Sequence, residues 1–131
     1  MSAAQRFRAA VETGDIGAVA ELLAADIVFH SPVTFHPFVG RDTVSGLLGL
    51  VAQTFEDFRY TDELEADGAH ALIFRASVGG RELEGIDLLR LGADGLISDF
   101  SVMLRPLSGL LPFAEAMAEK AQAAGLQTTR G

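Results

Sequence analysis

Cysteine and tryptophan are absent from this sequence of 131 residues, which has one tyrosine and one lysine. Without cysteine the chain forms no disulfide, no thiolate metal site and no thiol nucleophile. Acidic side chains outnumber basic ones by 18 to 10, which gives a net charge of −8. Binding to nucleic acid or to an anionic membrane surface is therefore not expected, because both need a basic patch. No apolar run approaches the ~18 residues of a membrane span.

The motifs of common cofactor sites are missing as well. His30, His36 and His70 show none of the spacings typical of metal ligands. No Gly-x-Gly-x-x-Gly loop is present for a dinucleotide, and no Gly-x-Ser-x-Gly turn surrounds Ser31. We therefore expect neither a metal nor a nucleotide cofactor.

Length and composition predict one globular domain, residues 1–131. A chain of this length has room for one domain of ~100–200 residues, and 49% hydrophobic with 21% charged residues is ordinary for a folded protein. The first residues lack the apolar core of a signal peptide, so the cytoplasm is the expected location. The excess of arginine over lysine, with many alanines, suggests a bacterial source.

Apolar residues at helical spacing predict three helices in the first half of the chain. A first short helix lies around Phe7, and a second follows Asp15 as far as Leu23. A longer helix is expected from about Asp42, as its N-cap, to Phe55.

The C-terminal segment also has an amphipathic pattern. Since proline is disfavoured inside a helix, Pro112 is expected in the first turn of a helix that ends at about Ala124. Residues Leu107–Leu111 would then form an apolar connector. We expect the segment after Arg105 to close the mouth of a pocket, and the alternative is that it packs on the dimer interface or on a neighbouring helix.

The second half is rich in strand patterns separated by turn residues. Asp67-Gly68 and Gly79-Gly80 are two-residue hairpin signals. The expected strands are Asp26–His30, which leads into an apolar loop as far as Phe38, Phe58–Ala66, Ala69–Val78, Arg81–Leu91 and Leu96–Arg105. Helices that precede an antiparallel sheet predict an α+β fold with the helices on one face.

Alternation along the strands predicts apolar residues on both faces of the sheet. In the segment Arg81–Leu91 one face carries Leu83, Gly85, Asp87 and Leu89. The opposite face of the sheet would carry Ile73, Ile86, Leu88, Ile97 and Met103. Such a patch predicts a homodimer through that face, unless these are scattered surface residues or bulges shift the alternation.

Asp87 is the leading candidate for chemistry, because a carboxylate is rare at the centre of an apolar strand. If it faces the helix-covered side of the sheet, desolvation should raise its pKa. The group could then act as an acid or base near neutral pH. The alternative is a structural aspartate in a salt bridge with Arg75 or Arg90.

Other candidates come from the segment before the longest helix and from the phenylalanines. Histidine is a residue type suited to acid–base catalysis, which makes His30 and His36 candidates, although both could be ordinary surface residues. Nine phenylalanines predict an interior that is either a filled core or a cavity for an apolar, aromatic or polycyclic ligand. The expected lining residues are Phe7, Phe29, Ser31, Phe38, Phe55, Phe74, Phe100, Val102 and Leu104, with Phe35 also directed inwards.

The order of these features resembles the nuclear transport factor 2-like superfamily, in its SnoaL-like and ketosteroid-isomerase-like branches. The resemblance covers roughly Ala3 to Pro106 and is most specific from Gly14-Asp15 to Pro32 and from Glu84-Gly85-Ile86-Asp87 to Asp94-Gly95. It implies a cone, in which a strongly curved antiparallel sheet wraps around the N-terminal helices, with a C-terminal helix added here. It also implies a pocket at the wide end and dimerisation through the sheet.

Only some of the catalytic residues of the isomerase pattern have a counterpart in this sequence. Asp87 matches the mid-strand aspartate that is kept neutral and donates to the oxyanion of the substrate. The general base is replaced by Ser31, the tyrosine of the first helix by Phe7, and the supporting tyrosines by Leu23 and Leu48. These departures argue against authentic ketosteroid isomerase activity.

The expected function is binding of a small apolar ligand that contains a carbonyl group, with metal-free proton transfer as in an isomerase or cyclase. Asp87 would be the acid or base, assisted by His30 or His36. One alternative is a non-catalytic small-molecule-binding or interaction domain of the same fold. A second is a hydrolase or dehydratase that uses His36 and Asp87.

Overall fold

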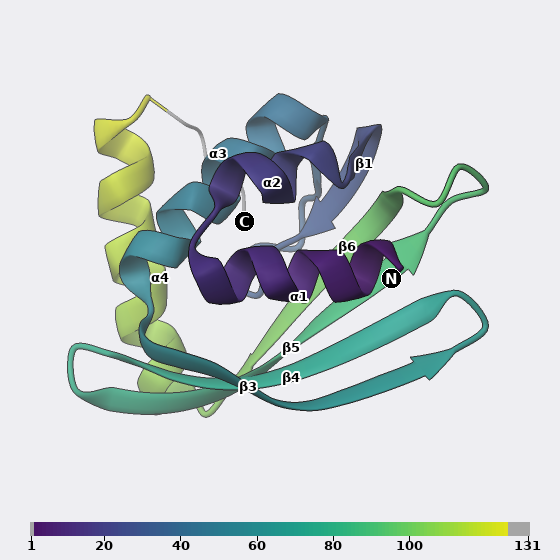
Figure 1. Cartoon of the computed structure of the whole chain (residues 1–131). Coiled ribbons are helices and arrows are strands. Elements are labelled where there is room, and N and C mark those ends of the chain that lie inside the picture. Colours follow the sequence, from purple (N-terminus) through teal and green to yellow (C-terminus); the bar gives the residue numbers. More distant parts are fainter. Residues whose placement is uncertain (1, 126–131) are drawn as a thin grey trace.

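The computed structural model describes residues 2–125. Helices α1–α3 lie along one side of the sheet, and α4 stands at its end (Figure 1). The elements of the described part are α1 (Ala3–Thr13), α2 (Ile16–Glu21), β1 (Leu23–His30), β2 (Phe38–Val39), α3 (Arg41–Thr54), β3 (Glu56–Ala66), β4 (Ala69–Val78), β5 (Arg81–Leu91), β6 (Ile97–Arg105) and α4 (Leu107–Ala123).

One curved, open sheet with the strand order β2-β1-β6-β5-β4-β3 forms the frame. Strands β3 to β6 make the antiparallel meander that the sequence predicts. Its turns at Asp67-Gly68 and Gly79-Gly80 have positive φ at both central residues, as type I′ hairpins require. The fold class is α+β, and this prediction is confirmed.

The N-terminal strand differs from the prediction. Leu23 was assigned to the second helix, but α2 ends at Glu21 and β1 begins at Leu23. Leu23 is fully buried and lies opposite Ile97 of β6, so strand pairing and burial outweigh its helical spacing. β1 runs parallel to β6, a pairing that the sequence did not reveal because no local turn connects the two strands.

The start of α3 also differs. The helix begins at Arg41 with Gly40 as its N-cap, and no side chain caps it. Asp42, the predicted cap, lies in the first turn, where the positive end of the helix dipole favours its carboxylate.

Helix α4 continues through Pro112, so residues 107–111 are helical and the predicted connector is wrong. The reason is close packing on the sheet. Gly109 is buried, and a β-carbon at this position would come within 2.9 Å of the carbonyl oxygen of Glu82 on β5. This contact holds the first turn of α4 on the sheet and outweighs the loss of one backbone hydrogen bond at Pro112.

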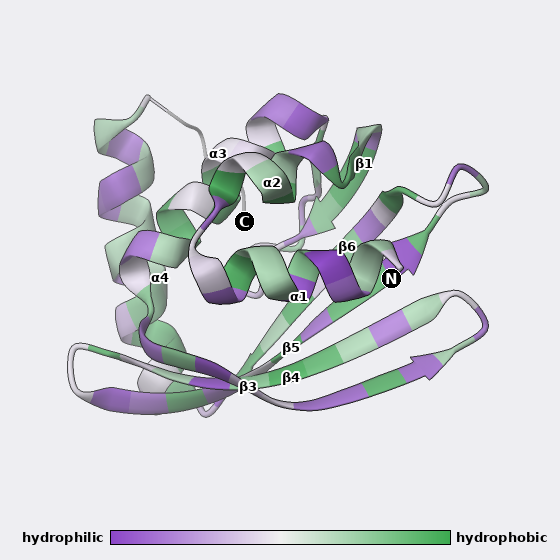
Figure 2. Ribbon diagram, in the orientation of Figure 1, coloured by the Kyte–Doolittle hydropathy of each residue, from purple (hydrophilic) through white to green (hydrophobic). Residues whose placement is uncertain are grey.

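Buried and more exposed residues alternate along β4 and β5, and the buried set faces the helices. Figure 2 shows hydrophobic and hydrophilic residues interspersed along the strands. The predicted face of β5 is confirmed, because Leu83, Gly85, Asp87 and Leu89 are all buried. The alternation thus places one carboxyl group among the apolar residues that pack beneath the helices.

Ile97 is a correction, since it was predicted on the outer face and is fully buried. Asp99 lies opposite Arg90, whereas Ile97 lies opposite the next residue, Leu91. Ser98 is therefore an extra residue on β6, and this bulge reverses the alternation that precedes it.

Candidate functional site

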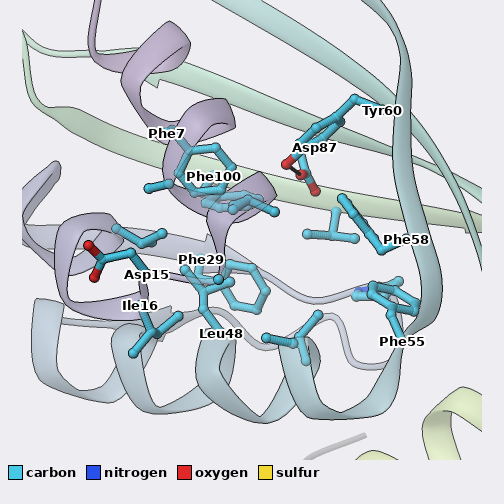
Figure 3. A pocket seen from close by; sticks show the side chains of 18 of the residues that line it. Phe7, Asp15, Ile16, Phe29, Leu48, Phe55, Phe58, Tyr60, Asp87 and Phe100 are labelled. Atoms are coloured by element: carbon cyan, nitrogen blue, oxygen red, sulfur yellow. Dashed lines mark hydrogen bonds between the residues drawn. The ribbon is translucent and has the colours of Figure 1, made fainter.

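A cavity of about 210 Å³ lies between the concave face of the sheet and helices α1–α3. Its lining is mostly apolar and includes many aromatic residues, and Figure 3 shows the rings of Phe7, Phe29, Phe55, Phe58 and Phe100 around it. The polar side chains of its described lining are Asp15, Tyr60 and Asp87. Gly14, Asp15 and Ile16 are exposed while Asp87 is buried, so the cavity opens at the junction of α1 and α2.

Asp87 is the buried acid of this cavity. It is 6% exposed, and its Oδ2 accepts a hydrogen bond of 2.9 Å from the hydroxyl group of Tyr60. Burial raises the pKa of Asp87 to about 7, although the hydrogen bond from Tyr60 opposes this shift. At neutral pH the side chain is therefore present in both its neutral and its ionised form.

The alternative of a salt bridge at Asp87 is wrong. Arg75 is exposed and contacts Glu84, with 3.4 Å between the charged groups. Arg90 is exposed on the outer face, where it pairs in register with Asp99. The hydrogen bond that the structure gives Asp87 comes from an uncharged donor, so an ionised carboxylate here has no compensating positive charge.

Tyr60 is a site residue that sequence reasoning missed. It lies on β3 with its ring edge against Phe58 and Phe74, and the guanidinium carbon of Arg8 lies 5.5 Å from its ring centroid. Burial, followed by the charge of Asp87, raises the pKa of Tyr60 above its ordinary value, so the hydroxyl group remains a donor. The sequence feature that could have identified Tyr60 is that it is the one tyrosine of the chain, which has nine phenylalanines.

The structure does not bring the histidines to Asp87. On β1 the alternation directs Phe29 inwards and His30 outwards, where Nε2 of His30 lies 3.1 Å from Oδ2 of Asp99. His36 is exposed in the loop before β2. Neither lines the cavity, so the expected convergence of His30 or His36 with Asp87 is absent from the described structure.

The predicted lining residues fall into three groups. This cavity is lined by Phe7, Phe29, Phe55, Phe100 and Val102. A second cavity of about 290 Å³, between α3, α4 and the loop 31–38, is lined by Ser31 and Phe38. Neither cavity includes Phe74 or Leu104.

Two of these outcomes have a clear packing reason. Phe74 is buried behind Phe58, with 4.8 Å between the stacked ring centroids. Phe35, which was expected to face inwards, is 98% exposed, because it lies in a loop between Pro32 and Pro37 and outside any strand.

The C-terminal helix contributes a wall to both cavities through Phe113. This side chain is buried, and its ring stacks on Phe55 with 5.1 Å between centroids. Leu110 packs on the core, whereas Leu107 and Leu111 are exposed. The segment after Arg105 therefore reaches the cavity that contains Asp87.

Within residues 2–125 no group of three potential ligands could hold a metal ion. In the same range, no helix is both long enough and apolar enough to span a bilayer.

Comparison with known proteins finds one matching family model and several similar solved structures. A model of the SnoaL-like domain matches residues 4–100, and no curated protein matches the chain. An uncharacterised bacterial protein with a cystatin-like fold from Silicibacter pomeroyi DSS-3 is 33% identical, with a TM-score of 0.90 over 94% of this chain and 87% of that one. A steroid delta-isomerase from Pseudomonas aeruginosa is 39% identical, with a TM-score of 0.89 over 93% and 90%. A putative ketosteroid isomerase from Kribbella flavida DSM 17836, 21% identical with a TM-score of 0.66 over 79% and 76%, shares the fold.

Proposed function

Since the chain belongs to the SnoaL-like domain family, we propose that its cavity binds a small, neutral, apolar carbonyl compound and that Asp87 transfers a proton next to the carbonyl group. One observation carries this proposal: a carboxyl group with a pKa of about 7 is buried in a largely apolar cavity. A group that titrates near the working pH is suited to give and to accept protons.

The lining sets the chemical class of the ligand. No lysine, arginine or histidine is among the residues that line the cavity, and Asp15 lies at its mouth. Carboxylates and phosphates are therefore disfavoured, because nothing would offset their charge. The volume of about 210 Å³ exceeds the ~150 Å³ of an engineered cavity that holds benzene, so a ligand head of one or two small rings fits.

The proposed chemistry needs one acid–base group. Ionised Asp87 accepts a proton from the carbon next to the carbonyl group, which breaks a C–H bond and leaves an enolate. The same carboxyl group then returns the proton to another carbon, which regenerates the carboxylate and shifts the double bond. Tyr60 holds Oδ2 and thereby leaves Oδ1 for the substrate. The 39% identical steroid delta-isomerase supports an isomerase-type reaction.

We expect the protein to convert 3-cyclohexenone into 2-cyclohexenone, and Asp87→Asn to lower the rate roughly a hundredfold, as loss of an acid–base group does. Absorbance of the conjugated product measures the rate. His36→Ala is the matched control and should leave the rate unchanged, since His36 is exposed and outside the cavity. Calorimetric binding without conversion would favour the non-catalytic alternative, and an effect of His36→Ala would favour a hydrolase or dehydratase.

A second candidate ligand is an organic ammonium ion, because aromatic rings around a carboxylate also bind cations. The uptake or release of a proton on binding distinguishes the two ligands. A neutral carbonyl compound displaces water from the carboxylate and so raises the pKa of Asp87 further, and binding at pH 8 therefore takes up a proton. An ammonium ion stabilises the ionised form, so binding at pH 6 releases one. Calorimetry in two buffers of different ionisation enthalpy counts these protons.

We also propose that the chain forms a homodimer through the convex face of the sheet. Ile73 lies opposite Ile86, which lies opposite Met103, and Leu88 is the neighbour of this row. Met103 is about half exposed. A charged cluster of Arg75, Glu84 and Arg105 flanks the patch, which gives the apolar centre and polar rim of a protein interface.

Leu88→Glu is expected to convert this dimer into a folded monomer, because it places a carboxylate in the centre of a dry interface. Sedimentation velocity measures the association, and circular dichroism the fold. Leu107→Glu on α4, where the side chain is exposed and lies outside the patch, should leave the dimer intact. A monomeric parent protein at micromolar concentration would contradict the proposal.

A further inference from the structure

The second cavity lies directly beside the first. The two share Phe29, Pro32, Val51 and Phe113 as lining residues. The first cavity, at about 210 Å³, is smaller than the ~300–1,000 Å³ typical of small-molecule sites, and the second, at about 290 Å³, is at the lower limit of that range. The two volumes together lie well within it.

The partition between the cavities consists of side chains. Phe29 and Phe113 are both buried and each lines both spaces. Phe113 stacks on Phe55 of the first cavity, while Phe29 contacts Phe38 of the second, with 6.5 Å between ring centroids. The two spaces therefore meet at these two rings, which both of them contact.

The second cavity has an apolar lining and its outer wall is α4. Met117, Ala114 and Ala118 of this helix line it, and Glu115 is the one charged residue of its described lining. Glu115 is exposed and therefore lies at the rim. Helix α4 follows residues 4–100, the part matched by the SnoaL-like model, so one wall of this compartment comes from a segment outside that match.

We propose that the two cavities are compartments of one binding site, and that the ligand is an elongated neutral compound with its carbonyl group at Asp87 and an apolar chain that passes Phe113 into the second compartment. The continuity of the shared walls carries the assignment, because a chain that leaves the first cavity past Phe113 enters the second without crossing solvent. This inference rests on the proposed function, which supplies the position of the carbonyl group.

Straight-chain methyl ketones of about six to fourteen carbons test the inference by calorimetry, because each buried methylene should tighten binding roughly three- to fourfold. In the parent protein the affinity is expected to keep rising with chain length, even for ketones longer than those that fill the first cavity. Ala118→Phe fills the second cavity only, since Ala118 lines it and not the first. Binding of the short ketones should remain unchanged in this variant, while the gain with length stops and the longest ketones bind at least tenfold more weakly.

Ala123→Phe is the matched control, because Ala123 lies on the same helix but is exposed. It should reproduce the length dependence of the parent protein. If Ala118→Phe folds and binds long and short ketones as the parent does, the second cavity is not part of the site and the inference is wrong, while the proposed function stands. If no ketone binds to the parent protein, the proposed function fails and the inference fails with it. Should Ala118→Phe not fold, Met117→Trp offers a second way to fill the compartment, with the same expected loss of the gain with length.

Discussion

Asp87→Asn is expected to be more stable than the parent protein at pH 8, by up to about 4 kcal/mol, and nearly equal to it at pH 4. The pKa of Asp87 is about 7 in the folded protein, against an ordinary value of 3.8. Between these values the folded state holds a proton that the unfolded state has released, so the stability of the parent protein falls as the pH rises. Each unit of pKa difference corresponds to about 1.4 kcal/mol.

The measurement is the difference in free energy of unfolding between the two proteins, from urea denaturation at a series of pH values. That difference should grow by about 2–3 kcal/mol between pH 5 and pH 8 and then remain constant. Using the difference removes the contributions of groups that both proteins share. Asp15→Asn is the control, because Asp15 is an exposed helix N-cap and asparagine caps a helix equally well.

A constant difference across the pH range would contradict the raised pKa of Asp87. A loss of more than about 3 kcal/mol at every pH would show instead that an ionised carboxylate holds the fold together through a buried charged partner. The result thus also bears on the site, because the proposed proton transfer needs a group that titrates near neutral pH.

Gly85→Ala is expected to destabilise the protein by about 3 kcal/mol, the upper part of the usual range for overpacking. Gly85 lies opposite Phe74 on the concave face. A β-carbon at position 85 would approach Cζ of Phe74 to 2.3 Å, Cδ2 of Leu104 to 2.6 Å and the carbonyl oxygen of Met103 to 2.8 Å. Because one of these neighbours is backbone, the sheet itself would have to shift.

Chemical denaturation followed by circular dichroism measures this loss. Gly49→Ala is the matched control, since its β-carbon would meet only Ile16, at 3.9 Å. In the interior of α3 this change should stabilise the protein by up to ~1 kcal/mol, from helix propensity alone. A Gly85→Ala variant as stable as the parent would show that Phe74 can turn aside, and the aromatic packing beside Asp87 would then be looser than its geometry indicates.

Local patterns in the sequence account for most of the fold. The turns at Asp67-Gly68 and Gly79-Gly80, and the alternation along β5, depend on neighbouring residues, and both predictions match the structure. The parallel pairing of β1 with β6 depends on residues far apart in the chain, and the position of Ile97 depends on a bulge at Ser98. Periodicity carries no information about such contacts, so a bulge or a distant partner can reverse a local prediction.

The candidate site was predictable to a smaller extent. Asp87 stood out because charge contradicted its apolar strand, and five of the predicted lining residues line the cavity that contains it: Phe7, Phe29, Phe55, Phe100 and Val102. Tyr60 lies between Arg59 and Thr61 in a strand of mostly exposed residues, so nothing in its neighbourhood marked it as inward. His30 and His36 were chosen for their chemistry, but the direction of a side chain on β1 and the course of the loop 31–37 determine what they can reach.

The pairing of β1 with β6 also affects how the chain folds during its synthesis. His30 and its partner Asp99 are 69 residues apart, and β1 has β2 and β6 as its neighbours in the sheet. During synthesis β1 emerges from the ribosome long before β6. Until β6 emerges, β1 can therefore pair only with the two residues of β2. Contacts of such long range slow folding, so the apolar side chains of Leu23, Ile27 and Phe29 depend on α3 for cover while the meander is being made.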